Sequence, residues 1–333
     1  MPGMRRRDVL VGLMAAGAAL GGAPGGAPRG AWAQTDWPNR PVRAIVPYPP
    51  GATTDWIMRA LVERLSRQLG QQFVIEHKGG AVGTIGTEAV ARATPDGYTM
   101  LLSPQAPIQV LPHLRKLAYD SLKDFVTVGR MGEAVAGFAV HPSVGVKTLP
   151  EFIALAKKNP GKYTYATAGV GSMNHLRGET LKLMAGIDLL HVPYKGVGEA
   201  LPDLLSGVVS SMFDASVFPH VKGGKLFMVA TLADERHPDF PDVKTVKEQG
   251  FPDFDVPIWF GAYPPAGTPP PIIEKLHAAI ATIHGDEAFR AQQMTGGVAV
   301  YKQALSLPQL RERVAQQYNQ FGDLAKRANI RLD

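Results

Sequence analysis

Two blocks of the chain alternate short apolar runs with longer stretches of helical periodicity. In the first block, runs of strand length are separated by amphipathic stretches that repeat with the period of a helix. Strands are predicted at 42–46, 73–76 and 98–102. Helices are predicted at 55–69 and 84–92, and the proline-rich segment 103–125 has no clear period. Apolar strands that alternate with helices predict a parallel sheet covered on both faces.

A second block of similar plan begins near residue 135. Strands are predicted at 135–140, 163–167, 189–192, 208–213 and 226–231. Helices are predicted at 150–158, 173–185 and 198–206, and helical patterns return at 270–284, 286–294 and 307–329. Thr148 and Glu151 have the spacing of a capping box, which marks the start of the helix at 150–158.

The two blocks predict an α/β protein with two doubly wound lobes, since each block has about the size of one such domain. Extended stretches near 130–135 and 255–262 are expected to join the lobes as a hinge beside an interdomain cleft. Lobe 1 is assigned residues 34–132 and 258–333, and lobe 2 residues 133–257. Ligands of open α/β sheets bind outside the carboxyl ends of the strands, so the strand-to-helix loops should lie at the cleft.

The first 33 residues have the pattern of a bacterial export signal: a basic start, a short apolar middle, and small residues at Ala31 and Ala33. We therefore expect cleavage after Ala33 and a periplasmic or secreted mature chain. The pair Arg6-Arg7 resembles a twin-arginine motif, and the choice between that route and ordinary secretion stays open. Glycine and proline interrupt the apolar run well short of the roughly 20 residues that a membrane span needs, so no membrane insertion is expected.

Charge and cysteine content narrow the function classes. Four arginines and one aspartate fall in residues 1–33, so their removal lowers the formal net charge from +6 to +3. That balance is too mild to predict a nucleic-acid or membrane-surface protein. The chain has no cysteine, which excludes disulfides, a thiol nucleophile, cysteine metal sites and a lipid-modified cysteine.

Three loops share one design, in which glycine and hydroxyl residues come just before a helix. They are "PYPPGATTD" at 47–55, "HKGGAVGTIGTE" at 77–88 and "ATAGVGSMNH" at 166–175. A helix start leaves main-chain N–H donors unpaired and has a partial positive charge, and glycine lets a ligand approach the backbone. Each loop alone is most simply an N-cap, but their coincidence on consecutive strand-to-helix units predicts a receptor for a small carboxylate.

Other interpretations of these loops fit less well. The glycines after Gly80 lack the spacing of a dinucleotide fingerprint, and the sequence around Ser172 lacks the nucleophile elbow of a hydrolase. His175 and Glu179 are four residues apart, which we interpret as an ordinary helix-surface pair rather than as metal ligands. We expect no catalytic residue, no cofactor and no metal ion.

Charged residues near the loops receive similarly plain interpretations. Asp55 and Arg59 are expected to form an intrahelical pair. Lys195 is expected to be a solvated loop lysine. Asp214 follows an apolar strand, and the sequence leaves open whether it receives a cation or hydroxyl of a ligand or caps the following turn.

Taken together, the sequence motifs of this chain resemble those of the solute-binding receptors of tripartite tricarboxylate transporters, often called Bug-type receptors. The resemblance covers nearly the whole chain after residue 37. It is carried by "VPYPPGATTD" (46–55), "GTIGTEAVARATPDGYTM" (83–100), "YDSLKDF" (119–125), "YATAGVGSMNH" (165–175), "HVPYKG" (191–196), "FPDV" (240–243) and "PPAGTPPPII" (264–273).

The resemblance implies a type II periplasmic-binding-protein fold that closes like a Venus flytrap, with no catalysis and uptake of small organic acids. It implies membrane components of a tripartite transporter as partners, and we expect a monomer. Matching positions in the first lobe are Tyr48, Thr53, Thr54, Asp55, Gly83 and Thr84. Matching positions in the second lobe are Thr167, Gly169, Gly171, Ser172, His175 and Asp214.

The sequence departs from the family pattern in each binding loop. Gly51-Ala52 stands where two glycines are usual, and 78–83 lacks the usual proline. The segment 103–117 also differs from the sequence that is usual at this place in the family. We therefore expect Val82 and the region from Gln105 to Gln109 to reshape the distal part of the pocket, with Gln105 as a ligand contact. Which acid is bound does not follow from the family.

Two further functions remain in view. A secreted α/β hydrolase or lyase would use Ser172 or Asp214 with His175, although the sequence offers no third member for such a triad. A sensory domain that reports its ligand to a membrane kinase would share the same binding loops, so the sequence barely separates it from a transport receptor.

Overall fold

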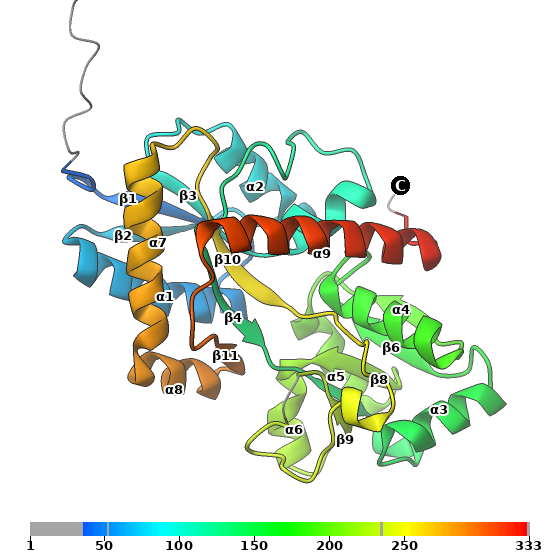
Figure 1. The fold of residues 1–333 in the computed structure, drawn as a ribbon. Helices are drawn as coiled ribbons and strands as arrows, with labels where there is room; N and C mark the ends of the chain where they lie inside the picture. The colour runs from blue at the N-terminus through cyan, green and yellow to red at the C-terminus, as the bar shows by residue number, and fades with distance from the viewer. Residues whose placement is uncertain (1–35, 52, 234–235, 332–333) are drawn as a thin grey trace, which may run out of the picture. The chain divides into compact units, whose positions relative to one another are not determined.

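A computed structural model describes residues 36–51, 53–233 and 236–331 of the chain. The export signal predicted at 1–33 and Ala52 of the first loop lie outside these described residues. Figure 1 shows the described part as two β-sheets with helices packed around them. None of the described helices is both long and apolar enough to cross a membrane.

The first sheet is mixed and has the strand order β11-β4-β10-β3-β1-β2. Its strands are β1 (Val42–Val46), β2 (Phe73–His77), β3 (Thr99–Pro104), β4 (Gly129–Ala134), β10 (Trp259–Tyr263) and β11 (Val298–Val300). Strand β1 pairs in parallel with β2 and β3, as predicted. Strand β10 pairs antiparallel with both β3 and β4, and β11 pairs antiparallel with β4. The predicted parallel pairing is therefore confirmed for β1, β2 and β3, whereas the sheet as a whole is mixed.

The second sheet has the order β7-β6-β8-β5-β9 and is also mixed. Its strands are β5 (Gly137–Val140), β6 (Thr164–Thr167), β7 (Leu190–Pro193), β8 (Ser211–Asp214) and β9 (Phe227–Thr231). Strand β6 runs parallel to β7 and β8, whereas β5 runs antiparallel to β8 and β9. The chain thus enters the second sheet directly after β4 and returns to the first sheet at β10.

The stretches near 130–135 and 255–262, which were predicted as extended connections between the lobes, overlap strands β4 and β10 of the first sheet. Strand β4 is hard to find in the sequence because Gly129, Arg130, Gly132 and Glu133 interrupt its apolar pattern. Its pairing with β10 and β11 supplies the strand geometry that its own residues do not favour.

The helices follow the sequence pattern closely. They are α1 (Thr53–Leu69), α2 (Thr84–Ala91), α3 (Leu149–Lys158), α4 (Met173–Ala185), α5 (Val197–Ser206), α6 (Phe218–Lys222), α7 (Pro270–Gly285), α8 (Glu287–Thr295) and α9 (Leu307–Arg327). The short α6 was not predicted. The capping box of Thr148 and Glu151 is confirmed, with the Thr148 hydroxyl accepting from the N–H of Glu151.

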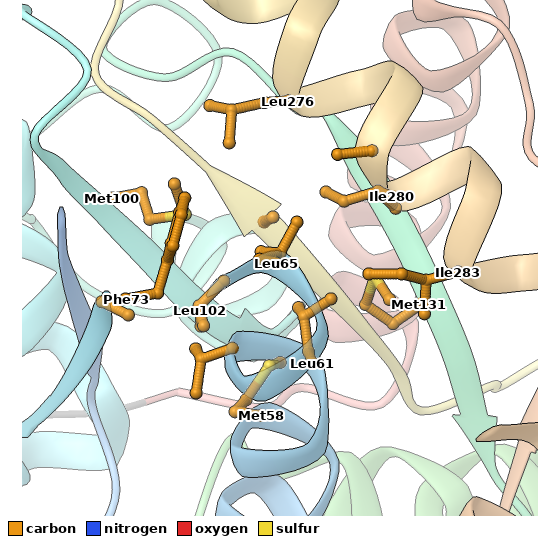
Figure 2. Packing of buried hydrophobic residues seen from close by; sticks show 14 of the residues in the cluster. Met58, Leu61, Leu65, Phe73, Met100, Leu102, Met131, Leu276, Ile280 and Ile283 are labelled. Carbon is orange, nitrogen blue, oxygen red and sulfur yellow. The ribbon is translucent and has the colours of Figure 1, made fainter. Parts of the chain in front are cut away.

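Helices α1 and α7 cover one face of the first sheet. Ile57, Leu61 and Leu65 of α1 repeat every four residues, so they lie on one face of the helix and are fully buried. Figure 2 shows α1 residues Leu61 and Leu65 in the same core as Leu276 and Ile280 of α7 and residues of β3. Burial of each such side chain contributes about 1.5–3 kcal/mol to stability.

The second sheet is covered on both faces. On the face toward α3, the rings of Phe138 and Phe213 stack with their centroids 4.1 Å apart, and Phe152 packs edge-on against Phe138. On the other face, Met212 packs with Leu204 of α5. This sandwich of helices around the strands holds the carboxyl ends of β6 and β8 in fixed positions.

Helix α9 joins the two regions. The indole N–H of Trp259 in β10 donates to the side-chain oxygen of Gln317 of α9 at 2.7 Å. Further along α9, Phe321 packs in one apolar cluster with Met173 and Leu176 of α4. Helix α9 therefore contacts both the first sheet and α4, the helix that follows the third predicted binding loop.

Candidate functional site

The first loop is fixed around the carboxylate of Asp55. The Asp55 Oδ2 atom accepts hydrogen bonds from the Gly51 N–H and from Arg59 Nε, both at 2.9 Å. The pair with Arg59 confirms the predicted intrahelical contact. Burial alone would raise the pKa of Asp55, but the hydrogen bonds from Arg59 and Gly51 outweigh it and hold the pKa below its usual value. Asp55 thus stays ionised and shapes the loop.

The second loop has a strained backbone. Gly80, Ala81, Val82 and Gly83 all have positive φ angles, from 48° at Ala81 to 125° at Gly80. A left-handed conformation costs about 1–2 kcal/mol for a residue with a side chain, and it is least expected for a β-branched residue such as Val82. The loop ends at Thr84, whose hydroxyl donates to the carbonyl of Ala81 at 3.1 Å.

Tyr48 ties the first loop to the second. Its hydroxyl donates to the Val82 carbonyl at 3.2 Å, and burial raises its pKa, so the hydroxyl keeps the proton that it donates. Any side chain at Gly83 would press on the Tyr48 ring, with a Cβ only 3.1 Å from the hydroxyl oxygen. His77 at the end of β2 also contacts the Tyr48 carbonyl at 2.8 Å. The starts of α1 and α2 are therefore brought together.

The third loop is held by hydrogen bonds to its own side chains. The Ser172 hydroxyl accepts from the His175 N–H at 3.3 Å, so Ser172 is the N-cap of α4. The His175 ring nitrogen Nδ1 accepts from the Gly171 N–H at 3.2 Å. The Thr167 hydroxyl accepts from the Gly169 N–H at 3.2 Å. Hydrogen bonds within the chain therefore define the conformation of this loop without a ligand contact.

A column of stacked rings, made of His175, His191 and Tyr165, packs beneath the third loop and joins α4 to β7 and β6. His175 stacks on His191 of β7 with centroids 4.0 Å apart, and His191 stacks on Tyr165 of β6 at 5.0 Å. Burial and the neighbouring His191 lower the pKa of His175 to about 3, and burial lowers the pKa of His191 to about 4. Both imidazoles are therefore neutral near pH 7, so each has one unprotonated ring nitrogen, and in His175 the Gly171 N–H that donates to Nδ1 identifies Nδ1 as that nitrogen.

The same column corrects one prediction. His175 and Glu179 were interpreted as a helix-surface pair, but both are buried. Glu179 accepts from the Tyr165 hydroxyl at 2.5 Å and from Lys182 at 2.9 Å. Because Tyr165 comes from the neighbouring strand β6, the helix periodicity alone could not show this burial.

Asp214 lies at the carboxyl end of β8, beside the third loop. Its Oδ1 accepts from the Ser216 N–H at 2.9 Å, which is the capping role that the sequence left open. Its Oδ2 accepts from the side-chain amide of Asn174 at 2.9 Å, and the same amide donates to the Phe213 carbonyl at 2.8 Å. Asn174 of α4, which the sequence analysis did not single out, thus joins the helix start to the strand end.

The second and third loops meet in one apolar cluster. Val82 and Val170, one from each loop, pack against a core that includes Val110, Met173 and Phe321. Val82, where the sequence departs from the family pattern, therefore packs against the same apolar cluster as Val170 of the third loop. Tyr48, Val82 and Asn174 together link the starts of α1, α2 and α4 and the end of β8.

The remaining predicted site residues take different places. Thr54 is buried and Thr53 half-buried at the start of α1. Gln105 is fully buried, and its amide donates to the Pro257 carbonyl and accepts from the Trp259 N–H. Both polar atoms of Gln105 thus hold the chain at the entry to β10. Lys195 is exposed, as expected.

The geometry speaks against a serine hydrolase. The Ser172 hydroxyl is engaged with the main-chain N–H of His175, while the His175 ring faces Gly171 and His191. No serine-to-imidazole hydrogen bond of the kind that activates a nucleophile is present in this described pair. The described residues also contain no group of three or more His, Asp or Glu placed to hold a metal ion.

Three comparisons place this geometry among known proteins. A sequence model described as the tripartite tricarboxylate transporter family receptor matches residues 57–330. Protein BugT of Bordetella pertussis is 37% identical over 271 residues, covering 79% of this chain and 83% of that protein.

Two solved structures share the fold. The periplasmic binding protein BugD has a TM-score of 0.77 at 34% identity, covering 89% of this chain and 99% of that one. The protein Rpa4515 of R. palustris, solved with adipate, has a TM-score of 0.80 at 30% identity, with coverage of 89% and 99%. Since the family consists of solute-binding receptors and not of enzymes, the hydrolase alternative is set aside. This chain belongs to the tripartite tricarboxylate transporter receptor family, and its fold is the two-lobe α/β fold of periplasmic binding proteins.

Proposed function

We propose that the mature chain is a periplasmic receptor that captures a small carboxylate and delivers it to the membrane components of a tripartite transporter. The observation that carries the proposal is the convergence of the starts of α1, α2 and α4 around Tyr48, Val82 and Asn174. Helix starts of this kind favour anions because their first N–H groups lack partners within the helix. The adipate found with Rpa4515 supports a carboxylate as the ligand.

The proposal keeps the two-lobe division, with 34–132 and 258–333 in one lobe and 133–257 in the other. In it, Thr53, Thr54 and Thr84 bind from the first lobe. Gly169, Gly171 and Ser172 bind from the second. Asp55, His175 and Asp214 act by shaping their loops, since Asp55 Oδ2, His175 Nδ1 and Asp214 Oδ1 accept hydrogen bonds from main-chain N–H groups of those loops. Gln105 is left out of the ligand contacts for the same reason.

The hydrogen bonds that the loops can donate to a carboxylate are sufficient in number and strength for a micromolar Kd. A micromolar Kd corresponds to about 8 kcal/mol at the usual standard state. Hydrogen bonds to a charged group contribute about 1.5–3 kcal/mol each before the costs of ordering, so several donors from three helix starts reach that scale. No residue of the site has to change protonation for binding.

A thermal-shift screen of the chain from Gln34 onward tests the proposal. At a hundredfold excess over Kd, a carboxylate that binds only the folded state stabilises it by about 2.7 kcal/mol. We expect a rise of several degrees in Tm for one or a few mono- or dicarboxylates. A broad panel of organic acids that leaves Tm unchanged would overturn the proposal.

Two variants locate the site. Ser172→Leu fills the start of α4 and should abolish the ligand-induced rise in Tm. Ser306→Leu removes the N-cap serine of α9, which is exposed, and serves as the matched control. Each loses a cap contact worth about 1 kcal/mol, and Ser172→Leu also adds bulk at a buried position, so it should lower the Tm without ligand by more than Ser306→Leu does. An undiminished ligand response in Ser172→Leu would remove the third loop from the site.

Transport and sensing are separated by the partner. Co-purification from membranes with the ligand present should recover transporter components, in line with the receptor family. Recovery of a membrane kinase in their place would support the sensory function.

A further inference from the structure

Arg177 of α4 is a buried cation with unused donors. Its side chain has no exposed surface, and its Nε donates to the Val256 carbonyl at 3.0 Å. Its two terminal nitrogens, Nη1 and Nη2, are buried and have no hydrogen-bond partner. Burial lowers the pKa of Arg177 to about 10, which still leaves it protonated near pH 7. The guanidinium is therefore a buried positive charge, and four of its five N–H donors are unmet.

The position of Arg177 is set by the face of α4 that it shares with Asn174. The two residues are three apart, so their side chains lie on one side of the helix, and the longer one leans toward the helix start. Asn174 reaches Asp214 at the end of β8. Asp214 and Glu133 of β4 are also the charges that Arg177 feels. The guanidinium thus interacts electrostatically with Asp214, the residue that Asn174 joins to the start of α4.

The two neighbouring carboxylates are already engaged elsewhere. Asp214 accepts from Ser216 and Asn174, and Glu133 accepts from the Tyr301 hydroxyl at 3.1 Å. A buried cation without a hydrogen-bonded partner costs several kcal/mol. Two terminal nitrogens of one guanidinium present parallel N–H groups, which match the two oxygens of a carboxylate. A guest carboxylate would satisfy both donors at once.

We propose that Arg177 binds a second carboxylate of the ligand, so that the receptor prefers dicarboxylates to monocarboxylates of the same chain length. The inference rests on the proposed function: the helix starts hold one carboxylate, and Arg177 holds the other. Arg177 is then a specificity-determining residue.

Isothermal titration with matched pairs of acids tests this assignment. The probes are succinate, glutarate and adipate against butyrate, pentanoate and hexanoate. We expect the native protein to bind at least one dicarboxylate about a hundredfold more tightly than its monocarboxylate counterpart, since a lost bidentate partner costs about 2.7 kcal/mol. Arg177→Gln should remove most of that ratio and leave the monocarboxylate affinity within about threefold.

Two further variants sharpen the test. Arg177→Lys keeps the charge but loses the paired donors, so its ratio should lie between those of the native protein and Arg177→Gln. Lys182→Gln removes one positive charge from the same helix, where Lys182 pairs with Glu179, and should leave the ratio unchanged.

The outcomes are distinguishable. A native protein that binds mono- and dicarboxylates equally well overturns the role of Arg177 and leaves the proposed function standing, and this measurement does not depend on whether a variant folds. An equal loss of both ligands in Arg177→Gln shows a structural role and also overturns it. A native protein that binds no carboxylate overturns the proposed function together with the inference.

Discussion

The second and third loops both position a helix start, but they do so by opposite means. At Gly80–Thr84, four consecutive positive φ angles set the direction in which the backbone enters α2, and few side-chain contacts fix the loop. At Thr167–His175, ordinary caps and a column of buried rings fix the conformation of the loop. Thr167, Ser172 and His175 are all buried. One loop is shaped by backbone strain and the other by the packing beneath it.

This difference shows how each loop should respond to change. A strained loop is stabilised by any residue that tolerates the left-handed region. A loop that rests on a packed column is destabilised by almost any change in the column, because buried groups have little room to adjust. The predictions below test this contrast, beginning with the largest expected effect.

The largest effect is expected at Gly178, which lies against the ring of Tyr165. A Cβ at this position would overlap the ring atoms, so the column of Tyr165, His191 and His175 would have to move. We expect Gly178→Ala to lower the free energy of unfolding by about 2 kcal/mol, measured in urea, and to weaken the ligand response. Gly198→Ala on α5 is the control, because no atom lies within 4 Å of a Cβ there. Equal effects in the two variants would contradict the contrast.

A smaller effect is expected from pH. The pKa of His191 is lowered to about 4 in the folded state, so between that value and its ordinary value near 6.5 the unfolded chain binds more protons. Stability should therefore be fully present above pH 6.5 and fall as the pH drops toward 4. From pH 7 to pH 5, the loss from His191 should be on the order of 1 kcal/mol.

Urea unfolding of His191→Gln at the same two pH values isolates this contribution. The fall in stability between pH 7 and pH 5 should be smaller than in the native protein. The remaining slope has other sources, because the pKa of His175 is lowered to about 3 and that of His284, near the first sheet, to about 4. A slope that is unchanged in His191→Gln would show that the column does not resist protonation.

The smallest effect is expected in the second loop. Ala81 is exposed with a φ of 48°, so Ala81→Gly removes strain without loss of packing. We expect a gain of up to about 1 kcal/mol in the free energy of unfolding. Ala278→Gly, at an exposed position inside α7, should instead lose about that amount. If both variants lose stability, the second loop is not under strain.

Parts of the fold could be predicted from local pattern, and others could not. Helix α4 was predicted with both of its ends, because Ser172 caps it and Gly186 terminates it. Strands β4, β10 and β11 were not predicted as strands, because their geometry comes from antiparallel partners distant in sequence. Gly261 of β10, for example, pairs with Ser103 on one side and Arg130 on the other.

The candidate site divides in the same way. Ser172 was predicted from the composition of a loop before a helix, Asp214 from its place after an apolar strand, and Tyr48 from the family resemblance. His191 and Asn174, which hold the third loop, were not predicted, since each acts across to another element: His191 on His175 and Asn174 on Asp214. Nothing in the periodicity of α4 marks its polar positions as buried.

The sequence by itself determined where helices begin, which loops expose main-chain donors, and which family the sequence motifs resemble. These properties depend on residues close together in the chain, through caps, glycine conformations and helical period. Only the tertiary structure decided the antiparallel strands, the neutral histidine column and the buried guanidinium of Arg177. Burial and partnership are properties of neighbours in space, and a local pattern does not specify which distant segment will supply them.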